Sequence, residues 1–386
     1  MRPGSRWRRL LEWRINSIIT TVKILNDIDG MRAALAQAAK ALYTATPNPR
    51  VGCVIVRDGE VLAEGHTQPT GFAHAEAYAL QHAHQQGIDV RGATAYVSLE
   101  PCSHHGRTPP CADALVAAGI ARVVVALEDP NPLVAGQGLA KLRAAGIQVE
   151  LGVLAEQARE INRGFLHRMQ HHRPWVRMKI AASLDGGTAL QNGESQWITS
   201  ALARDDGHAW RARACAVLTG IGTVQQDDPQ LNVRAVQTTR QPHRIVIDSQ
   251  LQISSQAKIL QGAAGWIFTT VASGERLVQL RAEGHEVIAL PDADGKVDLH
   301  ALMDELGRRE INELHVEAGF KLNGSLLRAD VVDELLLYVA PCLLGPAQGL
   351  ARLPVLEHLR DRMAFHIHEV EQVGPDLRLR LMRARF

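Results

Sequence analysis

Short apolar runs separated by longer amphipathic segments organise the first half of the chain. The runs have the length of buried strands and lie at 51–56, 61–64, 93–99, 122–127 and 148–151. The segments between and after them are predicted to be helical: 73–83, 110–118, 139–145 and 154–170. Strands that alternate with helices favour a sheet covered by helices, so we expect an α/β domain.

The same alternation starts again after residues 171–174, which are predicted to be a solvated linker. Strands are predicted at 176–182, 216–219, 244–247, 265–269, 286–290, 313–316 and 334–340. Helices are predicted at 201–213 and 299–308. The length suits more than one domain, and we expect two α/β domains, residues 31–172 and residues 173–386.

Residues 1–30 differ from the rest of the chain, because five arginines stand among tryptophans and leucines. A basic amphipathic segment can touch a membrane surface or act as a targeting peptide. Its apolar part is short and broken by polar residues, and it has no small-residue cleavage pattern. We therefore expect an extension outside the fold, with a helix that opens at Met31 and runs to Leu42.

The charge balance limits what the chain can bind. Its 42 basic and 41 acidic residues give a net charge of +1. Duplex binders usually carry a clear positive excess, and single-strand binders need aromatic platforms, whereas only 4% of these residues are aromatic. We expect a small-molecule substrate and no nucleic-acid partner.

Cysteine content and hydropathy bear on the compartment. Five cysteines, an odd number, are spread too widely for a disulfide framework. Such thiols suit a reducing cytosol, so we expect a cytoplasmic protein. No apolar run approaches the roughly 20 residues that span a bilayer, and we expect no membrane partner.

The clearest chemistry lies in His74-Ala75-Glu76, Pro101-Cys102 and Cys111. One imidazole and two thiolates can hold a tetrahedral Zn²⁺ and leave its fourth position to water. Glu76 lies two residues after the histidine, where its carboxylate can carry a proton to a leaving amine. This order of residues is the signature of zinc nucleobase deaminases, although eight residues separate the cysteines here. We predict one catalytic zinc ion per chain.

Two other functions could use the same residues. One is a deaminase of bases in RNA or DNA with the second half as a binding module, which the charge and aromatic content disfavour. The other is a structural zinc site closed by a fourth protein ligand, which His104 or His105 could supply. Zinc spectroscopy separates this second alternative, because a closed structural site has no water ligand.

Two glycine clusters come directly after predicted strands in the second half, at 219–223 and 317–325. A glycine-rich turn before a helix offers backbone N–H groups to a phosphate, and a helix is predicted at 326–329. No Gly-x-Gly-x-x-Gly comes after a strand, so a Rossmann site is not indicated. Arg211 and Arg234 could each bind a substrate phosphate through two hydrogen bonds, or could simply be surface arginines.

Longer motifs resemble one known family. Asn48-Pro-Arg-Val-Gly52, Glu100-Pro-Cys102, Asp129-Pro-Asn-Pro132, Ala182-Ser-Leu-Asp-Gly186 and Glu194-Ser-Gln-Trp-Ile-Thr-Ser200 are similar to motifs of the bacterial bifunctional deaminase/reductases of riboflavin biosynthesis. The resemblance runs from about residue 31 to the end and includes the eight-residue cysteine gap. It implies a cytidine-deaminase-like α/β/α domain, a dihydrofolate-reductase-like α/β domain, and a homo-oligomer.

The resemblance also implies two reactions on one phosphorylated pyrimidine: loss of the 2-amino group of a diaminopyrimidinone ribosyl phosphate, then NADPH-dependent reduction of ribosyl to ribityl. It assigns to the dinucleotide Ala181, Trp197, Thr223, Asp227, Ser249, Gly319, Phe320, Lys321, Leu322, Asn323, Gly324 and Ser325. It assigns to the substrate Ser195, Arg211, Leu231, Arg234 and Glu317 in the second half, and Asn48, His66, His104 and Arg107 in the first. Lys179 and Asp185 are expected to polarise the sugar.

Three positions near the implied cofactor cleft depart from the family. Ala181 stands where glycine can occur, Gly187 where a basic residue is frequent, and Phe320 where proline is frequent. Loss of a basic side chain at position 187 would weaken NADPH binding. The sequence therefore constrains the choice between NADPH and NADH less tightly than it constrains the choice of metal.

Overall fold

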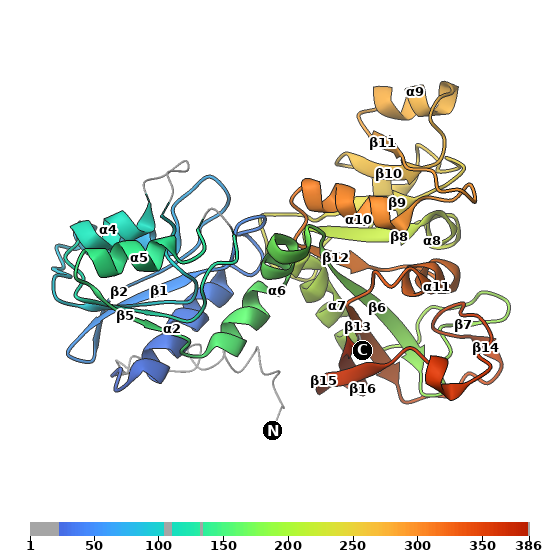
Figure 1. Ribbon diagram of the computed structural model, residues 1–386. Coiled ribbons are helices and arrows are strands. Elements are labelled where there is room, and N and C mark those ends of the chain that lie inside the picture. The colour runs from blue at the N-terminus through green and yellow to red at the C-terminus, as the bar shows by residue number, and fades with distance from the viewer. Residues whose placement is uncertain (1–22, 104–109, 132–133, 385–386) are drawn as a thin grey trace. The chain divides into compact units, whose positions relative to one another are not determined.

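The computed structural model describes residues 23–103, 110–131 and 134–384 (Figure 1). The chain divides into two compact units between His171 and His172. Each unit is built on a main sheet of its own. Across the described residues, every helix is too short or too polar to span a bilayer.

The first unit has a five-stranded sheet in the order β2-β1-β3-β4-β5. Its strands are β1 (Gly52–Arg57), β2 (Glu60–His66), β3 (Thr94–Val97), β4 (Arg122–Val125) and β5 (Gln148–Leu151). Its helices are α2 (Asp27–Lys40), α3 (Ala75–Gln85), α4 (Cys111–Ala117), α5 (Gln137–Ala144) and α6 (Ala155–His171). β1 pairs antiparallel with β2 and β3, and β3, β4 and β5 run parallel. Figure 1 shows α4 and α5 on one face of the sheet and α2 on the other, which confirms the predicted α/β class.

Two glycines let helices approach this sheet closely. A methyl group on Gly52 would lie 1.9 Å from the carbonyl oxygen of Ala34 in α2. A methyl group on Gly65 would lie 2.4 Å from the carbonyl oxygen of Ala75 in α3. A larger residue at either position would push the helix away. Gly65 therefore allows the first turn of α3, which carries Glu76, to pack closely against the sheet.

The start of α2 belongs to the fold of the first unit. Asn26 caps the helix, and its Oδ1 accepts the backbone N–H of Asp29 at 3.0 Å. The carboxylate of Asp27 accepts two hydrogen bonds from Arg122, at 2.7 and 2.8 Å, and one from the hydroxyl of Tyr96 at 3.1 Å. The helix therefore begins at Asp27 and not at Met31 as predicted.

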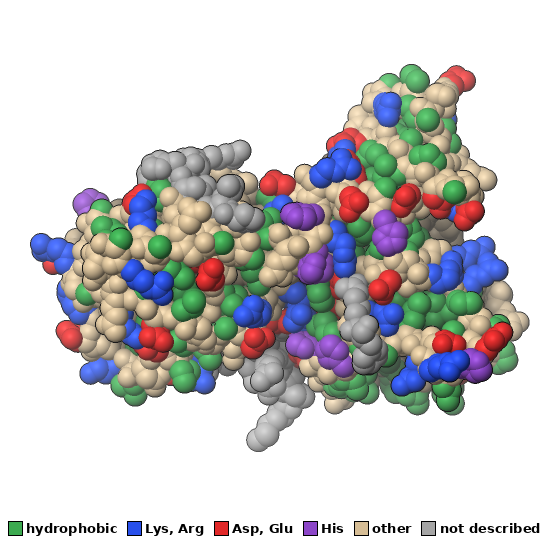
Figure 2. All heavy atoms as spheres, in the orientation of Figure 1, with side chains coloured by type: hydrophobic (Ala, Val, Ile, Leu, Met, Phe, Trp, Pro, Cys, Tyr) green, Lys and Arg blue, Asp and Glu red, His purple; other side chains and the backbone are tan. Residues whose placement is uncertain are grey.

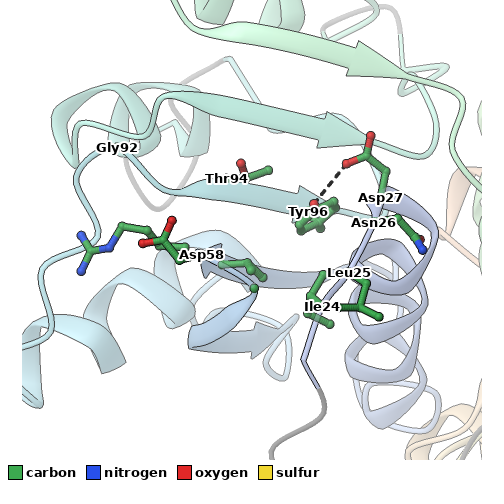
Figure 3. Close-up of a pocket in the computed structure, with 11 residues that line it drawn as sticks. Ile24, Leu25, Asn26, Asp27, Asp58, Gly92, Thr94 and Tyr96 are labelled. Atoms are coloured by element: carbon green, nitrogen blue, oxygen red, sulfur yellow. Dashed lines mark hydrogen bonds between the residues drawn. The ribbon is translucent and has the colours of Figure 1, made fainter.

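A pocket lies beside this helix start (Figure 3). Ile24 donates its N–H to the carbonyl of Gly59 at 2.8 Å, which holds the chain before α2 against the hairpin of β1 and β2. The pocket lies at the end of β3 that begins with Thr94, whereas Cys102 comes after the other end. It is lined by none of the predicted site residues.

The second unit has a nine-stranded sheet in the order β11-β10-β9-β8-β12-β6-β13-β16-β15. The parallel strands are β6 (Trp175–Ser183), β8 (Ala216–Gly220), β9 (His243–Ile247), β10 (Gly265–Thr269), β11 (Glu286–Ala289), β12 (Glu313–Val316) and β13 (Glu334–Ala340). The antiparallel strands β15 (Phe365–Val373) and β16 (Asp376–Arg383) extend one edge, and β7 (Ala189–Leu190) pairs separately with β14 (Ala347–Gln348). The helices are α7 (Ala201–Arg213), α8 (Ile221–Asp227), α9 (Glu275–Ala282), α10 (Leu299–Arg308) and α11 (Phe320–Arg328).

A buried charge network packs α7 against this sheet. The ring of Trp210 on α7 has four guanidinium groups between 4.5 and 5.6 Å from its centre, those of Arg177, Arg213, Arg378 and Arg380. Arg177 pairs with Glu313 and with Glu334 at 3.0 Å each, and all three side chains are almost fully buried. Arg380 pairs with Glu334 at 2.7 Å. The cations are thus neutralised locally, as burial of charge requires.

One boundary in this unit differs from the prediction. The glycine cluster at 317–325 was expected to be a turn, with a helix from 326. Instead α11 begins at Phe320, with Gly319 as its N-cap. On the face in view in Figure 2, acidic and basic side chains are interspersed, in line with the net charge of +1.

Candidate active sites

Three ligand-type side chains of the first unit converge between two helix starts. His74 is the N-cap of α3, Cys111 is the first residue of α4, and Cys102 comes after β3. Their ligand atoms lie within 4.8 Å of one another. The backbone N–H of Cys111 also donates to Sγ of Cys102 at 3.3 Å. Cys111 is buried, and His74 and Cys102 are partly exposed, so a small ligand can reach the cluster.

The distances within this cluster suit a tetrahedral zinc ion. Nδ1 of His74 lies 3.5 Å from Sγ of Cys102 and 3.5 Å from Sγ of Cys111. Zinc bonds of about 2.0 Å to nitrogen and about 2.3 Å to sulfur, at tetrahedral angles, separate the two atoms by about 3.5 Å. The three side chains therefore fit zinc as they stand and leave one coordination position to another ligand.

Glu76 lies in the first turn of α3 and is only 3% exposed. Burial, with a smaller effect of the nearby Cys102 sulfur, raises the pKa of Glu76 to about 7. The pKa of the Cys102 thiol is lowered, mainly because the Cys111 thiol donates a hydrogen bond to its sulfur. A carboxyl group with a pKa near neutrality can both accept and release a proton, which is the property a proton carrier needs.

Glu100 holds the backbone near the candidate zinc site in place, and the sequence alone did not predict this role. Its buried carboxylate accepts backbone N–H groups from Asp129 at 3.1 Å, Gly136 at 3.0 Å, Gly138 at 2.8 Å and Leu139 at 3.1 Å. These bonds hold Asp129, Gly136 and the first turn of α5 against the residues that lead into Cys102. An acidic residue directly before Pro-Cys was the only available signal.

Four further residues were predicted to hold the pyrimidine. Asn48 and His66 are both partly exposed, and His66 ends β2 with its ring 6.0 Å from the ring of Tyr78 on α3. Burial lowers the pKa of His66, with Lys40 acting in the same direction. His104 and Arg107 lie outside the described residues.

In the second unit, Glu317 directly follows β12 and lies close to Lys179 in the middle of β6 and to Arg211 in the last turn of α7. Nε of Arg211 donates to Oε1 of Glu317 at 2.7 Å, and another guanidinium nitrogen donates to the carbonyl of Asn232 at 2.6 Å. Burial opposes ionisation of Glu317, but Arg211, together with His315 and Lys179, outweighs it and holds the pKa of that carboxyl well below its usual value. Burial lowers the pKa of Lys179, on which Glu317 acts in the opposite direction. This arrangement offers cations to a phosphorylated sugar.

His315 was not predicted to be a site residue, and its ring lies next to Glu317. It is fully buried, and its Nε2 lies 3.5 Å from Oε1 of Glu317. Burial lowers the pKa of His315 to about 3, so the ring is neutral near pH 7. Within the described chain, neither ring nitrogen has a hydrogen-bond partner.

Two glycine N-caps lie side by side at the same edge of the sheet. Gly220 precedes α8 and Gly319 precedes α11, after the neighbouring strands β8 and β12. A methyl group on Gly319 would lie 3.6 Å from Oγ1 of Thr223, and one on Gly220 would lie 2.9 Å from Leu322. The carboxyl edge of a parallel sheet, with helix N-termini above it, is where nucleotides bind in α/β folds.

The other predicted cofactor residues are spread more widely. Trp197 is 68% exposed, and the guanidinium of Arg204 lies 4.4 Å from its ring centre. Asp227 is exposed at the end of α8, while Ser249 comes after β9 and its carbonyl accepts hydroxyl hydrogen bonds from Thr269 and Thr270. Among the predicted substrate residues, Leu231 is buried, Ser195 is partly exposed and Arg234 is exposed.

Part of α11 is used for packing. Nδ2 of Asn323 donates to the carbonyl of Leu350 at 3.1 Å. A methyl group on Gly324 would lie 2.1 Å from the carbonyl oxygen of Arg352, so only glycine fits there. Ser325 donates to the carbonyl of Lys321 in its own helix. These contacts secure the 350–352 segment against the helix.

Asp185 and Gly187 also have structural contacts. The carboxylate of Asp185 accepts the hydroxyl of Ser183 at 2.5 Å and the backbone N–H of Gly345 at 2.8 Å. A methyl group on Gly187 would lie 2.9 Å from Cβ of Ala347 and 3.0 Å from Oγ of Ser183. The backbone here leaves no room for the basic side chain that is frequent in the family. Ala181 lies on β6, paired in register with Tyr338.

Comparison with known proteins assigns each unit to a class. Residues 25–127 match the cytidine and deoxycytidylate deaminase zinc-binding region, and residues 174–379 match the RibD C-terminal domain. The two sites therefore belong to a protein that joins a zinc deaminase unit to a reductase unit.

Whole-chain relatives have the same organisation. The riboflavin biosynthesis protein RibD of Escherichia coli K12 is 48% identical over 367 residues, which are 92% of this chain and 98% of that protein. The structure of Acinetobacter baumannii RibD is similar with a TM-score of 0.85 at 40% identity, over 93% of this chain and 99% of that one. A Thermotoga maritima structure described as a diaminohydroxyphosphoribosylaminopyrimidine deaminase/5-amino-6-(5-phosphoribosylamino)uracil reductase gives a TM-score of 0.84 at 33% identity, with the same shares covered.

The chain belongs to the RibD family of bifunctional deaminase/reductases of riboflavin biosynthesis. The predicted fold class and the resemblance are confirmed. Zinc is the metal of the deaminase region, and the family's reductase domain depends on NADPH.

Proposed function

We propose that the first unit removes the 2-amino group of a diaminopyrimidinone ribosyl phosphate, and that the second reduces the ribosyl group of the product to ribityl. The observation that carries the first step is the cluster of His74, Cys102 and Cys111 at zinc-binding distances, with the buried Glu76 in the first turn of α3. The second step rests on the family and on the cations around Glu317.

In the deaminase unit, His74, Cys102 and Cys111 hold zinc, which when bound supplies a water molecule that is nucleophilic near neutral pH. Glu76 accepts a proton from the nucleophile and delivers it to the departing amine. Asn48 and His66, with His104 and Arg107, hold the pyrimidine and its phosphate.

In the reductase unit, the glycine-capped helix starts would hold NADPH, which would supply the hydride for the opened sugar. The paired helix starts at Gly220 and Gly319 bind the phosphates of the dinucleotide. Arg211 and Arg234 bind the substrate phosphate, and Glu317 holds Arg211 in place through the 2.7 Å ion pair. Lys179 polarises the sugar oxygen, because its ammonium group, carried by the middle of β6, lies close enough to Glu317 and Arg211 to interact with both electrostatically.

Mass spectrometry of one reaction series tests both steps. Zinc-loaded protein is given the diaminopyrimidinone ribosyl phosphate with and without NADPH. Replacement of an amino group by oxygen without cofactor, and gain of two hydrogens only with it, are expected. No change in either reaction would overturn the proposal, and deamination alone would restrict it to the first unit.

We also propose a cytoplasmic homo-oligomer. The five cysteines all lie within the described residues and none forms a disulfide bond, which suits a reducing compartment. Assembly rests on the family resemblance alone. Light scattering during gel filtration tests it, and a single monomer mass would contradict it.

A further inference from the structure

One face of α7 carries three basic side chains, of which only one has a proposed role. Arg204, His208 and Arg211 are spaced four and three residues apart, so they lie on the same side of the helix. Arg211 pairs with Glu317 and is a proposed ligand of the substrate phosphate. Arg204 donates to the carbonyl of Thr199 at 2.8 Å and stacks on Trp197. His208 lies between them, partly buried.

The ring of His208 has one bonded nitrogen and one free nitrogen. Nδ1 accepts the backbone N–H of Arg234 at 3.4 Å. A neutral imidazole that accepts at Nδ1 carries its proton on Nε2. Within the described chain, the Nε2 side of the ring has no hydrogen-bond partner. His208 therefore presents an unused N–H donor next to the two arginines that are assigned to the substrate phosphate.

The surroundings of His208 are strongly cationic. Arg211 and Arg234 both act on it electrostatically, and Glu317 and Asp205 act in the opposite direction. Burial first, and then these arginines, lower the pKa of His208. A phosphate dianion brought to this place is attracted by several cations and still needs donors at fixed angles. A neutral imidazole supplies such a donor without adding to the repulsion among the arginines.

We propose that His208 is a further phosphate-binding residue of the reductase site. Its Nε2–H donates to an oxygen of the substrate phosphate, and its Nδ1 fixes the backbone of Arg234 so that this arginine can reach the same group. The inference rests on the proposed function, because it takes the phosphorylated sugar as the ligand. It adds a specificity determinant that selects the phosphorylated substrate over its dephosphorylated form.

Two isosteric substitutions separate the two nitrogens. In His208→Asn, Oδ1 replaces the Nδ1 acceptor and the outer donor is lost. In His208→Gln, the amide N–H₂ replaces the Nε2 donor and the acceptor is lost. We expect the Asn variant to raise KM for the phosphorylated substrate at least about tenfold with kcat nearly unchanged, as for loss of a hydrogen bond to a charged group. The Gln variant should restore most of this KM.

The assay uses the full-length protein and the deaminated substrate, with and without its phosphate. Competitive inhibition by inorganic phosphate should weaken in the Asn variant by a factor similar to the KM change. His300→Asn, an exposed histidine on α10, is the matched control. Deaminase activity and thermal unfolding of each variant show whether it is folded.

The outcomes distinguish this inference from the proposed function. If the unsubstituted protein does not reduce the deaminated substrate, the proposed function fails and takes the role of His208 with it. If the unsubstituted protein is active and the Asn variant keeps its KM, only the role of His208 is overturned. An equal rise of KM for the dephosphorylated substrate, or a fall in kcat at constant KM, would also overturn it.

Discussion

The two sites are built in opposite ways. The proposed zinc ligands come from one stretch, 74–111, and the fold brings their ligand atoms within 4.8 Å of one another. The proposed reductase site joins Arg211 to Glu317 across 106 residues and adds Lys179 from β6. Metal coordination restricts residue type and distance, so it leaves a compact signature in the sequence. Phosphate binding uses arginines and backbone N–H groups that occur everywhere, so its signature is diffuse.

The sites also differ in how their charges are supported. Near the proposed zinc ligands, backbone N–H groups stabilise a buried carboxylate, as the four hydrogen bonds to Glu100 show. In the second unit, ion pairs between side chains stabilise the buried charges. This holds both for the network around Trp210 and for the pair of Arg211 and Glu317. We therefore expect the first unit to be sensitive to the chemistry of single side chains. We expect the second unit to be sensitive to substitutions that remove one charge of an ion pair.

The largest effect is expected from Glu76→Gln. The amide cannot carry a proton, so deamination should fall about 10²–10⁴-fold. Zinc content should stay at one ion per chain, because Glu76 is not among the three ligands. Reduction of the deaminated substrate should not change. Steady-state assays and metal analysis check this, with the exposed Glu156→Gln as control; near-normal deamination in the Glu76 variant would show that another group carries the proton.

The second prediction concerns the charge network. Glu334→Gln removes one of the carboxylate partners of Arg177 and of Arg380, which keep Glu313 and Glu369 respectively, and should lower the free energy of unfolding of the second unit by up to about 3–5 kcal/mol. Four of the six tryptophans lie in this unit, so urea unfolding followed by tryptophan fluorescence reports mainly on it. The exposed Glu275→Gln is the control. A loss equal to that of the control would mean that the network contributes little.

The same variant gives a pH test. Burial opposes ionisation of Glu334, but Arg177 and Arg380 outweigh it and hold its pKa well below the usual value. The charged form therefore stabilises the fold fully above the unfolded pKa of about 4.3, and this contribution is lost as the pH falls. Between about pH 5 and about pH 3, the free energy of unfolding should fall more steeply in the unsubstituted protein than in the variant.

A smaller effect is expected from Arg211→Lys. Lysine keeps the charge but loses the planar donor pair, so KM for the phosphorylated substrate should rise about tenfold to a hundredfold while kcat changes little. Reductase kinetics at saturating NADPH check this, and deaminase kinetics serve as the internal control. A lower kcat at constant KM would mean that Arg211 acts in the chemical step and not in phosphate binding.

Predictions from the sequence succeeded where they rested on a short motif or a strong apolar pattern, and failed where they depended on contacts that only the fold creates. The bounds of α10 and β12 agree with the structure, because their apolar patterns are strong. The strands β15 and β16 were not predicted, since inward-facing positions such as Arg378 and Arg380 carry charges that are neutralised only in the fold. Zinc could be predicted from a motif, whereas the role of Glu100 depends on backbone N–H groups that have no side-chain signal.

The smallest predicted effect tests the start of the first unit. Asn26→Ala removes the acceptor for the N–H of Asp29 and should cost about 1 kcal/mol. Asn26→Ser should recover most of this loss, because a serine hydroxyl caps a helix about as well. Since the tryptophans among the described residues all lie in the second unit, hydrogen exchange in α2 is the suitable measurement. Unchanged exchange in the Ala variant would mean that the turn at Asp27 is held by its pair with Arg122, and that the cap adds nothing measurable.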